Sequence, residues 1–540
     1  MKKLYTTIVI ALLSINAFGQ APQWEWVKLF GDSHAQQARG IEVDKEGNSY
    51  VCGIFYGLIT FDSITFDSRG ANDIFIAKFD PCGNVIWAKQ AGGIGYDGAL
   101  GNCIDNNGNS YITGYVADSA LFDTNQTLTT HKGNVFVAKY DNNGNNVWVR
   151  NSIGAESYGV YGNSVSVDNN GNVYFVGDFG IPTLSFDTIT ITNGLYESGI
   201  FIGKYDSNGN ILWVKKTSAI GGGVNDIHNY SIAVDSTGNS FVTGEFEGTV
   251  HFDSLEFHAT ASIDGWNSSD IFIVKYDNSG NVIWAEQAGG NGADAGIGIC
   301  IDSYGNSYIT GFYSMTANFD TTSLTALNTT TTETYLAKYD YNGNNVWAKK
   351  SVSIGGGITI DRNEELYTPI AKYNTSGDSV WSKSTGDYLY NYETGVDDSL
   401  NVYVAGFLMN TPTITLDTFH LTQMGGGDMF IGKLIVNPHN NCGWNSPDSL
   451  TVSVHSQIKS QSEILEIFPN PFTSQTTIKF GETQKNTTIK ITDLFGKVIR
   501  TLTFTGRQLI IDKAEMRAGI YFVQTTDEQK RTCNKKIIIQ

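Results

Sequence analysis

The chain has 540 residues, with 59 glycines but only nine prolines, 12% aromatic residues and a formal net charge of −19 at pH 7. The acidity is uneven, because residues 20–462 contain 21 Lys/Arg against 46 Asp/Glu, whereas residues 463–540 contain 12 against 8. A nucleic-acid partner is therefore excluded for the long acidic part, since phosphate backbones attract cationic surfaces. The length provides material for one large and one small domain.

The first residues predict an export signal. Lys2 and Lys3 precede an apolar stretch, Ile8–Leu13, and small residues follow at Ala17–Gly19. This pattern is typical of a secretory signal peptide spanning residues 1–19, and because no cysteine follows the cleavage region, a lipoprotein is not expected. No other segment approaches the roughly 18 consecutive apolar residues of a membrane-spanning helix, so we expect no transmembrane segment.

The next 400 residues repeat one unit that ends in tryptophan. The first five of these tryptophans lie 61, 65, 71 and 63 residues apart. Each unit contains hairpins with an Asp-x-x-Gly-Asn turn, in which Asp accepts backbone N–H groups and Gly adopts a positive φ. Apolar and polar residues alternate on both sides of the turns, which predicts four antiparallel strands per unit and a β-propeller. The tryptophans are Trp87, Trp148, Trp213, Trp284, Trp347 and Trp381.

The ends of the repeat predict how the ring closes. The last unit lacks its tryptophan strand after Gly432–Leu434, whereas an orphan strand stands at Gln23–Lys28. Pairing the two would leave no unpaired edge at the seam. Only 34 residues separate Trp347 from Trp381, so we expect a propeller of about seven four-stranded blades over residues 20–435, with the sixth truncated. Six full blades and an insertion are the alternative.

Most units also contain a variable stretch with the dipeptide Phe-Asp between their two hairpins, as at Phe61-Asp62, and we interpret it as a decorated loop or an extra hairpin. The repeated pattern Asp-x-x-Gly-Asn-x-Tyr-x-x-Gly, followed by aromatic-x-x-Lys-Tyr-Asp, resembles the bacterial β-propeller repeat (SBBP) family over roughly residues 23–437. The resemblance implies the fold and says little about activity, because propellers carry many unrelated functions.

The C-terminal part has a different character. After a polar linker at residues 436–462, alternating strands predict a small Ig-like β-sandwich over residues 463–540. Its motifs resemble the type A C-terminal sorting domain of the type IX secretion system of Bacteroidetes, with an ordinary Ig-like domain as the alternative. The resemblance implies contact with the type IX machinery, export across both membranes and removal of the domain. The matching residues are Pro469, Asn470, Pro471, Gly496, Gly519, Tyr521 and Lys536.

No catalytic or metal-binding motif stands out. The sequence has no Cys-x-x-Cys, His-Glu-x-x-His or Gly-x-Ser-x-Gly pattern, and its six cysteines do not recur with the repeat, so neither a cofactor nor a disulfide framework is predicted. Buried free thiols are expected at Cys52 and Cys103 rather than a bond between them. The turns at Asp141 and Asp206 faintly resemble calcium loops but lack the bidentate Glu that such loops need.

The connections from one blade to the next are the predicted ligand site, because they gather on one face of the ring around the central channel. Aromatic residues beside carboxylates at a concave mouth favour carbohydrate recognition. The alternative is that these side chains only cap strands and satisfy backbone groups. The candidates are His34, Tyr96, Asp97, Glu156, Tyr158, Asp226, His228 and Asp294.

The sequence therefore predicts a secreted or cell-surface propeller without enzymatic activity, with a binding or adhesion role toward a carbohydrate or protein ligand. One alternative is an extracellular polysaccharide-degrading enzyme, which would need paired carboxylates roughly 5–9.5 Å apart; Asp97, Asp226 and Asp294 are the residues to examine. The other alternative is a structural surface-coat protein.

Overall fold

The structure, a computed structural model, divides the chain into two compact units, Met1–Ser449 and Leu450–Gln540. Every element in the described part is a β-strand, and no helix among those residues is long and apolar enough to cross a membrane. The described residues are 22–123, 126–129, 133–154, 159–194, 197–220, 227–261, 268–328, 331–352, 356–383, 389–409, 413–435, 466–468, 470, 472–493, 497–513, 516–517, 519–526 and 532–539.

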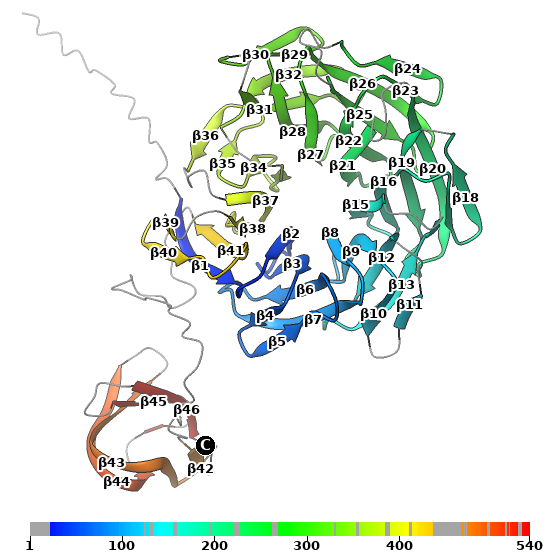
Figure 1. Ribbon diagram of the computed structural model, residues 1–540. Helices are drawn as coiled ribbons and strands as arrows, with labels where there is room; N and C mark the ends of the chain where they lie inside the picture. Colours follow the sequence, from blue (N-terminus) through cyan, green and yellow to red (C-terminus); the bar gives the residue numbers. More distant parts are fainter. Residues whose placement is uncertain are drawn as a thin grey trace, which may run out of the picture. The chain divides into compact units, whose positions relative to one another are not determined.

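The N-terminal unit is a ring of seven four-stranded antiparallel sheets, which confirms the predicted propeller (Figure 1). Each blade has a number, and its four strands, called A to D, are given from the innermost strand outward. Blade 1 is β2 (Gln36–Val43), β3 (Ser49–Phe55), β6 (Asp73–Phe79) and β7 (Val85–Gly93). Blade 2 is β8 (Gly98–Ile104), β9 (Ser110–Val116), β12 (Asn134–Tyr140) and β13 (Asn146–Asn151). Blade 3 is β15 (Val160–Val167), β16 (Val173–Phe179), β19 (Ser198–Tyr205) and β20 (Ile211–Ile220).

The remaining blades follow the same order. Blade 4 is β21 (Ile227–Val234), β22 (Ser240–Phe246), β25 (Asp270–Tyr276) and β26 (Val282–Gly290). Blade 5 is β27 (Ala295–Ile301), β28 (Ser307–Ser314), β31 (Thr332–Tyr339) and β32 (Asn345–Lys350). Blade 6 is β33 (Thr359–Ile360), β34 (Leu366–Thr368), β35 (Ala371–Tyr373) and β36 (Ser379–Ser382). Blade 7 is β37 (Leu389–Val396), β38 (Val402–Leu408), β41 (Asp428–Ile435) and β1 (Gln23–Phe30).

Blade 7 joins the two ends of the propeller, as the sequence predicts. β1 pairs antiparallel with β41 from Gln23 opposite Ile435 to Phe30 opposite Met429. Blade 6 is truncated as expected, but it keeps four short strands of two to four residues instead of losing half its sheet. The shortening therefore removes strand length and the B–C hairpin, and seven blades rather than six close the ring.

The aspartate turns are fixed by a repeated network. In blade 2, Asp105 Oδ1 accepts the backbone N–H groups of Asn107 and Asn109 at 2.9 and 3.0 Å. The hydroxyl of buried Tyr111 donates to Asp105 Oδ2 at 3.1 Å, and Lys139 Nζ lies 5.2 Å from the centre of the Tyr111 ring. A carboxylate that begins the turn thus makes burial of the tyrosine and lysine possible, and only blade 4 has a phenylalanine, Phe241, in place of the tyrosine.

Five tryptophans connect their blade to the next one by a hydrogen bond. Trp87 Nε1 donates to the carbonyl of Asn142 in the C–D turn of blade 2 at 3.0 Å, and its ring covers Gly144. Gly144 has φ +79°, and a Cβ there would lie 2.7 Å from Trp87 Cδ2. The repeat of Trp and Gly is therefore an interblade contact as well as turn chemistry. The same bond joins Trp26 to Pro81, Trp148 to Ser207, Trp213 to Asn278 and Trp284 to Tyr341.

The Phe-Asp stretches form extra hairpins, which decides between the two interpretations. Three of them pair with the outer strand of the preceding blade: β10 (Ser119–Asp123) with β7, β23 (Thr249–Phe252) with β20, and β29 (Thr316–Phe319) with β26. The turn aspartates Asp62, Asp187, Asp253, Asp320 and Asp417 all have φ between +51° and +55°, a conformation that Asp tolerates in two-residue hairpin turns. The remaining strands of these hairpins are β4 (Leu58–Phe61), β5 (Ile64–Asp67), β11 (Gln126–Thr129), β17 (Thr183–Phe186), β18 (Ile189–Thr192), β24 (Leu255–His258), β30 (Thr322–Thr325), β39 (Thr413–Leu416) and β40 (Phe419–Thr422); the short β14 (Ile153–Gly154) pairs with β17.

The cysteines divide into two groups. Cys52, Cys103 and Cys300 are buried free thiols, as expected for the first two. Cys82 is disulfide-bonded, which nothing in the sequence indicates.

The C-terminal unit is the predicted small β-sandwich. It contains β42 (Glu466–Phe468), β43 (Gln475–Asp493), β44 (Val498–Asp512), β45 (Gly519–Thr526) and β46 (Thr532–Ile539). The β43–β44 register shifts between Lys479 and Thr487, so that β42 pairs with the first half of β43 and β45 with the second. Its core contains the buried residues Ile478, Phe480, Ile489, Ile491, Val523 and Ile537.

Several residues of the sorting motif tie this unit together. Asn470 Oδ1 accepts the backbone N–H of Ile538 in the last strand at 2.8 Å. Tyr521 is buried, and its hydroxyl donates to the carbonyl of Arg517 at 3.0 Å. Gly519 pairs with Ile539 and Lys536 with Phe522 in the β45–β46 ladder. Pro469, Pro471 and Gly496 lie outside the described residues.

Candidate ligand-binding site at the mouth of the central channel

The innermost strands of all seven blades surround a central channel (Figure 1). Its cavity measures about 140 Å³. Successive strands run in opposite directions, so the interblade connections lie on one face of the ring, called here the loop face, and the aspartate turns on the other, the turn face. The mouth of the channel on the loop face is therefore where the predicted site residues were expected to gather.

A β-bulge at the same position supplies side chains to the channel wall. In blade 1 the β2–β3 register shifts between Ala38 and Gly40, which leaves Arg39 unpaired. The same shift recurs in the innermost strands of blades 2 to 5 and in blade 7. Bulges commonly redirect a side chain at a functional site. The unpaired residues that line the channel are Arg39, Leu100, Asn163, Tyr230 and Ile297.

A second position at the mouth changes from blade to blade beside an invariant glycine. In blades 2, 3 and 4 a Cβ on Gly114, Gly177 or Gly244 would lie only 1.9 Å from the carbonyl oxygen of the neighbouring strand, so no side chain fits there. The next residue is half-buried and free to vary. It is Tyr115 in blade 2, Asp178 in blade 3 and Glu245 in blade 4.

These varied side chains contact one another across blades. The rings of Tyr115 and Tyr161 meet edge to face, with their centres 5.4 Å apart and an interplanar angle of 83°. Tyr161 is directly opposite Asp178 in the β15–β16 ladder. Asp178 Oδ2 lies 2.9 Å from His228 Nδ1, which links blade 3 to blade 4. This hydrogen bond raises the pKa of His228 above its usual range although partial burial opposes it.

The row continues through blade 4. His228 is opposite Glu245 in the β21–β22 ladder, and the Tyr230 hydroxyl donates to Glu245 Oε1 at 2.6 Å. At the other end of the row, Arg39 Cζ lies 5.8 Å from the centre of the Phe407 ring, and burial lowers the pKa of Arg39. We call these seven residues the mouth arc: Arg39, Tyr115, Tyr161, Asp178, His228, Tyr230 and Glu245.

Two glutamates line the channel nearer the turn face. Burial raises the pKa of Glu42 to about 7. Burial and the charge of Glu42 together raise the pKa of Glu393 to about 8. Neither carboxyl group has a hydrogen bond or ion pair to another side chain in the described part of the chain. Aligning the repeats shows the other blades have Gly, Ala, Ser, Thr or Cys where these glutamates stand, so both are local additions to the wall.

The predicted site residues fall into different environments. Tyr96 is 58% exposed on the loop face, and His34 contacts Asp32 (Nδ1–Oδ2 3.2 Å) and the edge of Tyr56. Asp97 is fully buried and accepts the N–H groups of Gly93 at 2.7 Å and Ala117 at 2.9 Å.

Asp294 repeats this arrangement with Gly290 and Ser314. Asp97 and Asp294 are thus not presented at the mouth as expected, because their oxygens are used to hold the interblade connections. Only His228 joins the mouth arc. Glu156, Tyr158 and Asp226 lie outside the described residues.

The mouth arc tyrosines and the two channel glutamates were missed by the sequence analysis. Tyr115, Tyr161, Glu42 and Glu393 all lie within strands, whereas the search for a site was confined to connections. The signal that could have found them is a blade-to-blade comparison at fixed register. A charged or aromatic residue where other blades have a small one would have marked each position.

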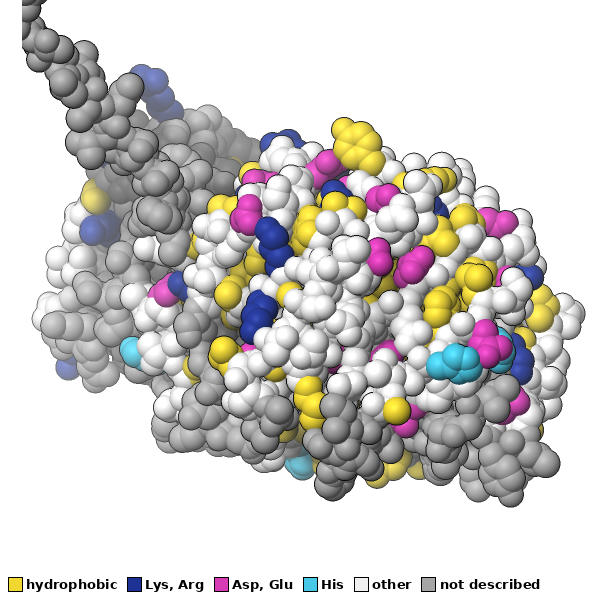
Figure 2. Space-filling view, turned by 90° about the horizontal axis from the view of Figure 1, so that it is seen from above, with side chains coloured by type: hydrophobic (Ala, Val, Ile, Leu, Met, Phe, Trp, Pro, Cys, Tyr) yellow, Lys and Arg dark blue, Asp and Glu magenta, His cyan; other side chains and the backbone are white. Residues whose placement is uncertain are grey.

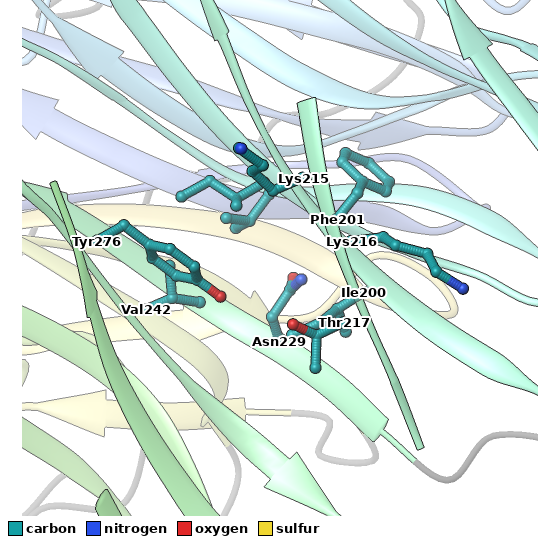
Figure 3. A pocket seen from close by; sticks show the side chains of 10 residues that line it. Ile200, Phe201, Lys215, Lys216, Thr217, Asn229, Val242 and Tyr276 are labelled. Atoms are coloured by element: carbon teal, nitrogen blue, oxygen red, sulfur yellow. The ribbon is translucent and has the colours of Figure 1, made fainter. Parts of the chain in front are cut away.

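A second hollow between the strands is a packing defect. It measures about 10 Å³ and lies among Ile200, Thr217, Asn229, Val242 and Tyr276 (Figure 3). This is about the space of a single water molecule. On the surface seen in Figure 2, acidic and basic side chains are interspersed and hydrophobic ones form only small groups.

The calcium-like turns have their carboxylates occupied. Asp141 Oδ1 accepts the N–H groups of Asn143 and Asn145, and its Oδ2 accepts the Asn145 side-chain amide at 2.9 Å. Asp206 is bonded in the same way. Among the described residues, no three His, Cys, Asp or Glu side chains are grouped so that they could hold a metal ion.

Comparison with known families identifies both parts of the chain. Residues 466–540 match the family described as secretion system C-terminal sorting domain, and residues 147–178 match the β-propeller repeat. An uncharacterized WD repeat-containing protein of Acanthamoeba polyphaga mimivirus is 24% identical over 427 residues, covering 63% of this chain and 30% of that protein.

A second curated relative and one of the similar solved structures are polysaccharide lyases. The endo-acting ulvan lyase of Formosa agariphila is 28% identical over 122 residues, which cover 22% of this chain and 21% of the lyase. The chain therefore spans less than a third of either curated relative. The crystal structure of the polysaccharide lyase Uly1 has a TM-score of 0.38 and 10% identity, over 77% of this chain and 92% of that one.

The matched repeat, the closed ring of seven sheets and the C-terminal match agree with one another. The chain is therefore a secreted or cell-surface protein in which a β-propeller of this repeat type is followed by a secretion system C-terminal sorting domain.

Proposed function

We propose that this protein is a surface-exposed binding or adhesion propeller, exported by the type IX machinery through residues 463–540, and that its mouth arc binds a carbohydrate chain. The observation that supports carbohydrate binding is the half-buried Tyr115–Tyr161 pair, whose ring centres lie 5.4 Å apart. Hydrogen-bonding carboxylates and His228 flank this pair. Aromatic faces contact the C–H surface of a sugar ring, and carboxylates accept its hydroxyl groups.

Charge narrows the class of carbohydrate. The acidic part of the chain has 46 Asp/Glu against 21 Lys/Arg, and the mouth arc adds Asp178 and Glu245 to a single arginine, Arg39. A polyanionic glycan would be repelled by this field, so a neutral glycan is favoured.

The tyrosine pair provides the test of binding. In a glycan-array screen of the full chain, we expect selective binding of neutral glycans. Tyr115→Ala or Tyr161→Ala should weaken binding about tenfold or more, because each removes a central aromatic contact. Tyr304→Ala, which removes a tyrosine that is 73% exposed in an A–B turn on the turn face, is the matched control and should bind like the wild type. Equal binding by all three variants would exclude the mouth arc, and no binding to any glycan would favour a protein ligand or a surface-coat role.

A second candidate, a polysaccharide-degrading enzyme, is favoured by Glu42 and Glu393. Two coupled carboxyl groups with pKa values near neutrality suit general acid and base roles. The similarity to the ulvan lyase adds a reason to test it.

Cleavage assays separate this candidate from simple binding. If the channel is catalytic, Glu393→Gln should reduce product formation by about 10²-fold or more while leaving glycan affinity unchanged, because an isosteric amide cannot transfer the proton. Reducing-end and unsaturated-sugar assays on array-positive glycans measure this. Intact glycans after prolonged incubation with wild-type protein would leave binding as the function.

A further inference from the structure

Two interblade connections share a sequence pattern and the same geometry. Residues 90–97 read Gln-Ala-Gly-Gly-Ile-Gly-Tyr-Asp, and residues 287–294 read Gln-Ala-Gly-Gly-Asn-Gly-Ala-Asp. Each ends in a fully buried aspartate, Asp97 or Asp294, that accepts two backbone N–H groups. Each connection is thereby held to the start of the following B–C hairpin on the loop face.

A second buried aspartate faces the first one. Asp73 Oδ2 accepts Gln90 Nε2 at 2.6 Å and the N–H of Arg69 at 3.2 Å, whereas the buried Asp73 Oδ1 has no hydrogen-bond partner in the described structure. Gly92 has φ +135°, and the position its Cβ would occupy lies 2.7 Å from Asp73 Oδ1 and 3.0 Å from Asp97 Oδ2. The unpartnered oxygen and a carboxylate oxygen of the connection thus both lie within 3.0 Å of the same point.

The second copy has the same pair. Asp270 Oδ2 accepts Gln287 Nε2 at 2.5 Å and the Thr260 N–H at 3.0 Å, and Asp270 Oδ1 again has no described partner. The Cβ position on Gly289, whose φ is +139°, lies 2.6 Å from Asp270 Oδ1 and 3.1 Å from Asp294 Oδ2. Recurrence in non-adjacent blades shows a built arrangement rather than an accident of one loop.

Two buried carboxylates close to each other cannot both be ionised without a large penalty, and a cation or a proton between them would remove that penalty. Calcium needs six to eight oxygen ligands, and among the described residues no third His, Cys, Asp or Glu joins either pair in a group that could hold a metal ion. Asp97 Oδ2 also already accepts the Gly93 N–H, which would face a cation unfavourably. A proton needs only the two oxygens that are present.

We propose that each aspartate pair shares one proton, with the Asp73 Oδ1–H donating to Asp97 Oδ2 and the Asp270 Oδ1–H donating to Asp294 Oδ2, and that these two carboxyl latches close the interblade connections in a pH-dependent way. The surroundings do not replace the proton. Arg69 donates from its guanidinium to the carbonyls of Gly92 and Leu121, and although its charge favours ionised Asp73, burial outweighs it and the pKa of Asp73 stays raised. The other titratable groups near the first pair are Asp67, Tyr115 and Asp118, and those near the second are Glu245, Tyr313 and Tyr335.

The direction of the pH effect follows from burial. Burial, with a contribution from the partner aspartate, raises the pKa of Asp97 to about 7 and that of Asp294 to about 7. Because the pKa is higher in the closed connection than in an open one, the latch is complete at about pH 4, weakens as pH rises, and is lost above about pH 7. Tyr96 directly precedes Asp97, so the latch also affects the position of the exposed Tyr96 ring. The consequence of this for ligand binding rests on the function proposed above.

Hydrogen exchange on the full chain tests the latch without any ligand. Peptides covering Gly92–Gly98 and Ala117 should lose protection by up to about tenfold per pH unit between about pH 4.5 and 7, after correction for intrinsic exchange, since one proton is linked to opening. In Asp73→Asn the amide supplies the missing N–H, so protection at pH 8 should exceed that of the wild type by about tenfold or more, with no decline from pH 5.

The controls make the experiment decisive. Asp141 has a lowered pKa because its hydrogen bonds from Asn145 and Asn143 outweigh burial, so its turn is fully stabilised above about pH 4 and its protection should stay level from about pH 4.5 to 8 in both proteins. A flat wild-type profile, or a wild-type slope kept in Asp73→Asn, would overturn the proposal. Protection restored at pH 8 by calcium in the wild type alone would also overturn it, in favour of a bound cation. If Asp73→Asn does not fold, Asp270→Asn and the wild-type slope give the same decision.

Discussion

Replacing Trp26 with alanine should lower the free energy of unfolding of the propeller by about 3–5 kcal/mol, the range for removing a large buried aromatic side chain. Trp26 is only 3% exposed in the closing strand β1, and its ring packs against Tyr403 with the centres 6.2 Å apart. Its Nε1 donates to the Pro81 carbonyl in blade 1 at 3.1 Å. The residue therefore contributes to both the seam of blade 7 and the contact with blade 1.

Urea unfolding followed by tryptophan fluorescence and circular dichroism measures this loss. Trp26→Phe is the matched control, because it keeps most of the packing and removes one hydrogen bond, which contributes about 1 kcal/mol. A loss below about 1 kcal/mol for Trp26→Ala would mean that β1 does not close the ring as described.

Replacing Glu25 with alanine should be comparably severe, about 3–5 kcal/mol, because it leaves a buried lysine without its charge partner. Glu25 Oε2 lies 2.9 Å from Lys433 Nζ, and the two side chains are 5% and 4% exposed. Lys433 comes from β41, so this ion pair joins the N- and C-terminal strands of the propeller. Thermal and urea unfolding both report the loss.

Two variants sharpen the result for Glu25. Lys28, which lies in the same strand as Glu25, forms an ion pair with Asp62, and these side chains are 23% and 48% exposed. Lys28→Ala should therefore lower the free energy of unfolding by less than about 1 kcal/mol. Glu25→Gln with Lys433→Met removes both charges and should recover most of the stability. Equal effects of Glu25→Ala and Lys28→Ala would show that the pair is solvated.

The fold could be predicted from sequence because its determinants are local and repeated. The turn aspartates, the positive-φ glycines and the tryptophans recur at fixed spacing, and the missing last strand has its counterpart at Gln23–Phe30. The short spacing between Trp347 and Trp381 also indicated that blade 6 is truncated. The four strands that pair with one another within it could not be predicted, because strands of two to four residues are too short to show an alternating pattern.

The site could be predicted only in part. Asp97 was predicted to lie at the ligand site, but it is buried and holds an interblade connection, and Asp73, whose carboxylate lies near it, is 24 positions away and looks like an ordinary strand residue. The β-bulge that brings Arg39 into the channel is a property of strand register, and register is settled by pairing rather than by composition. A position-by-position comparison of the blades identifies such residues.

The most direct test of the central claim is a crystal structure of the protein with the tightest-binding neutral glycan from the array. The account predicts density for a sugar ring beside Tyr115 and Tyr161, with hydroxyl groups within hydrogen-bond distance of Asp178 or Glu245. A glycan bound instead to the outer hairpins or the turn face, with an empty mouth, would contradict it.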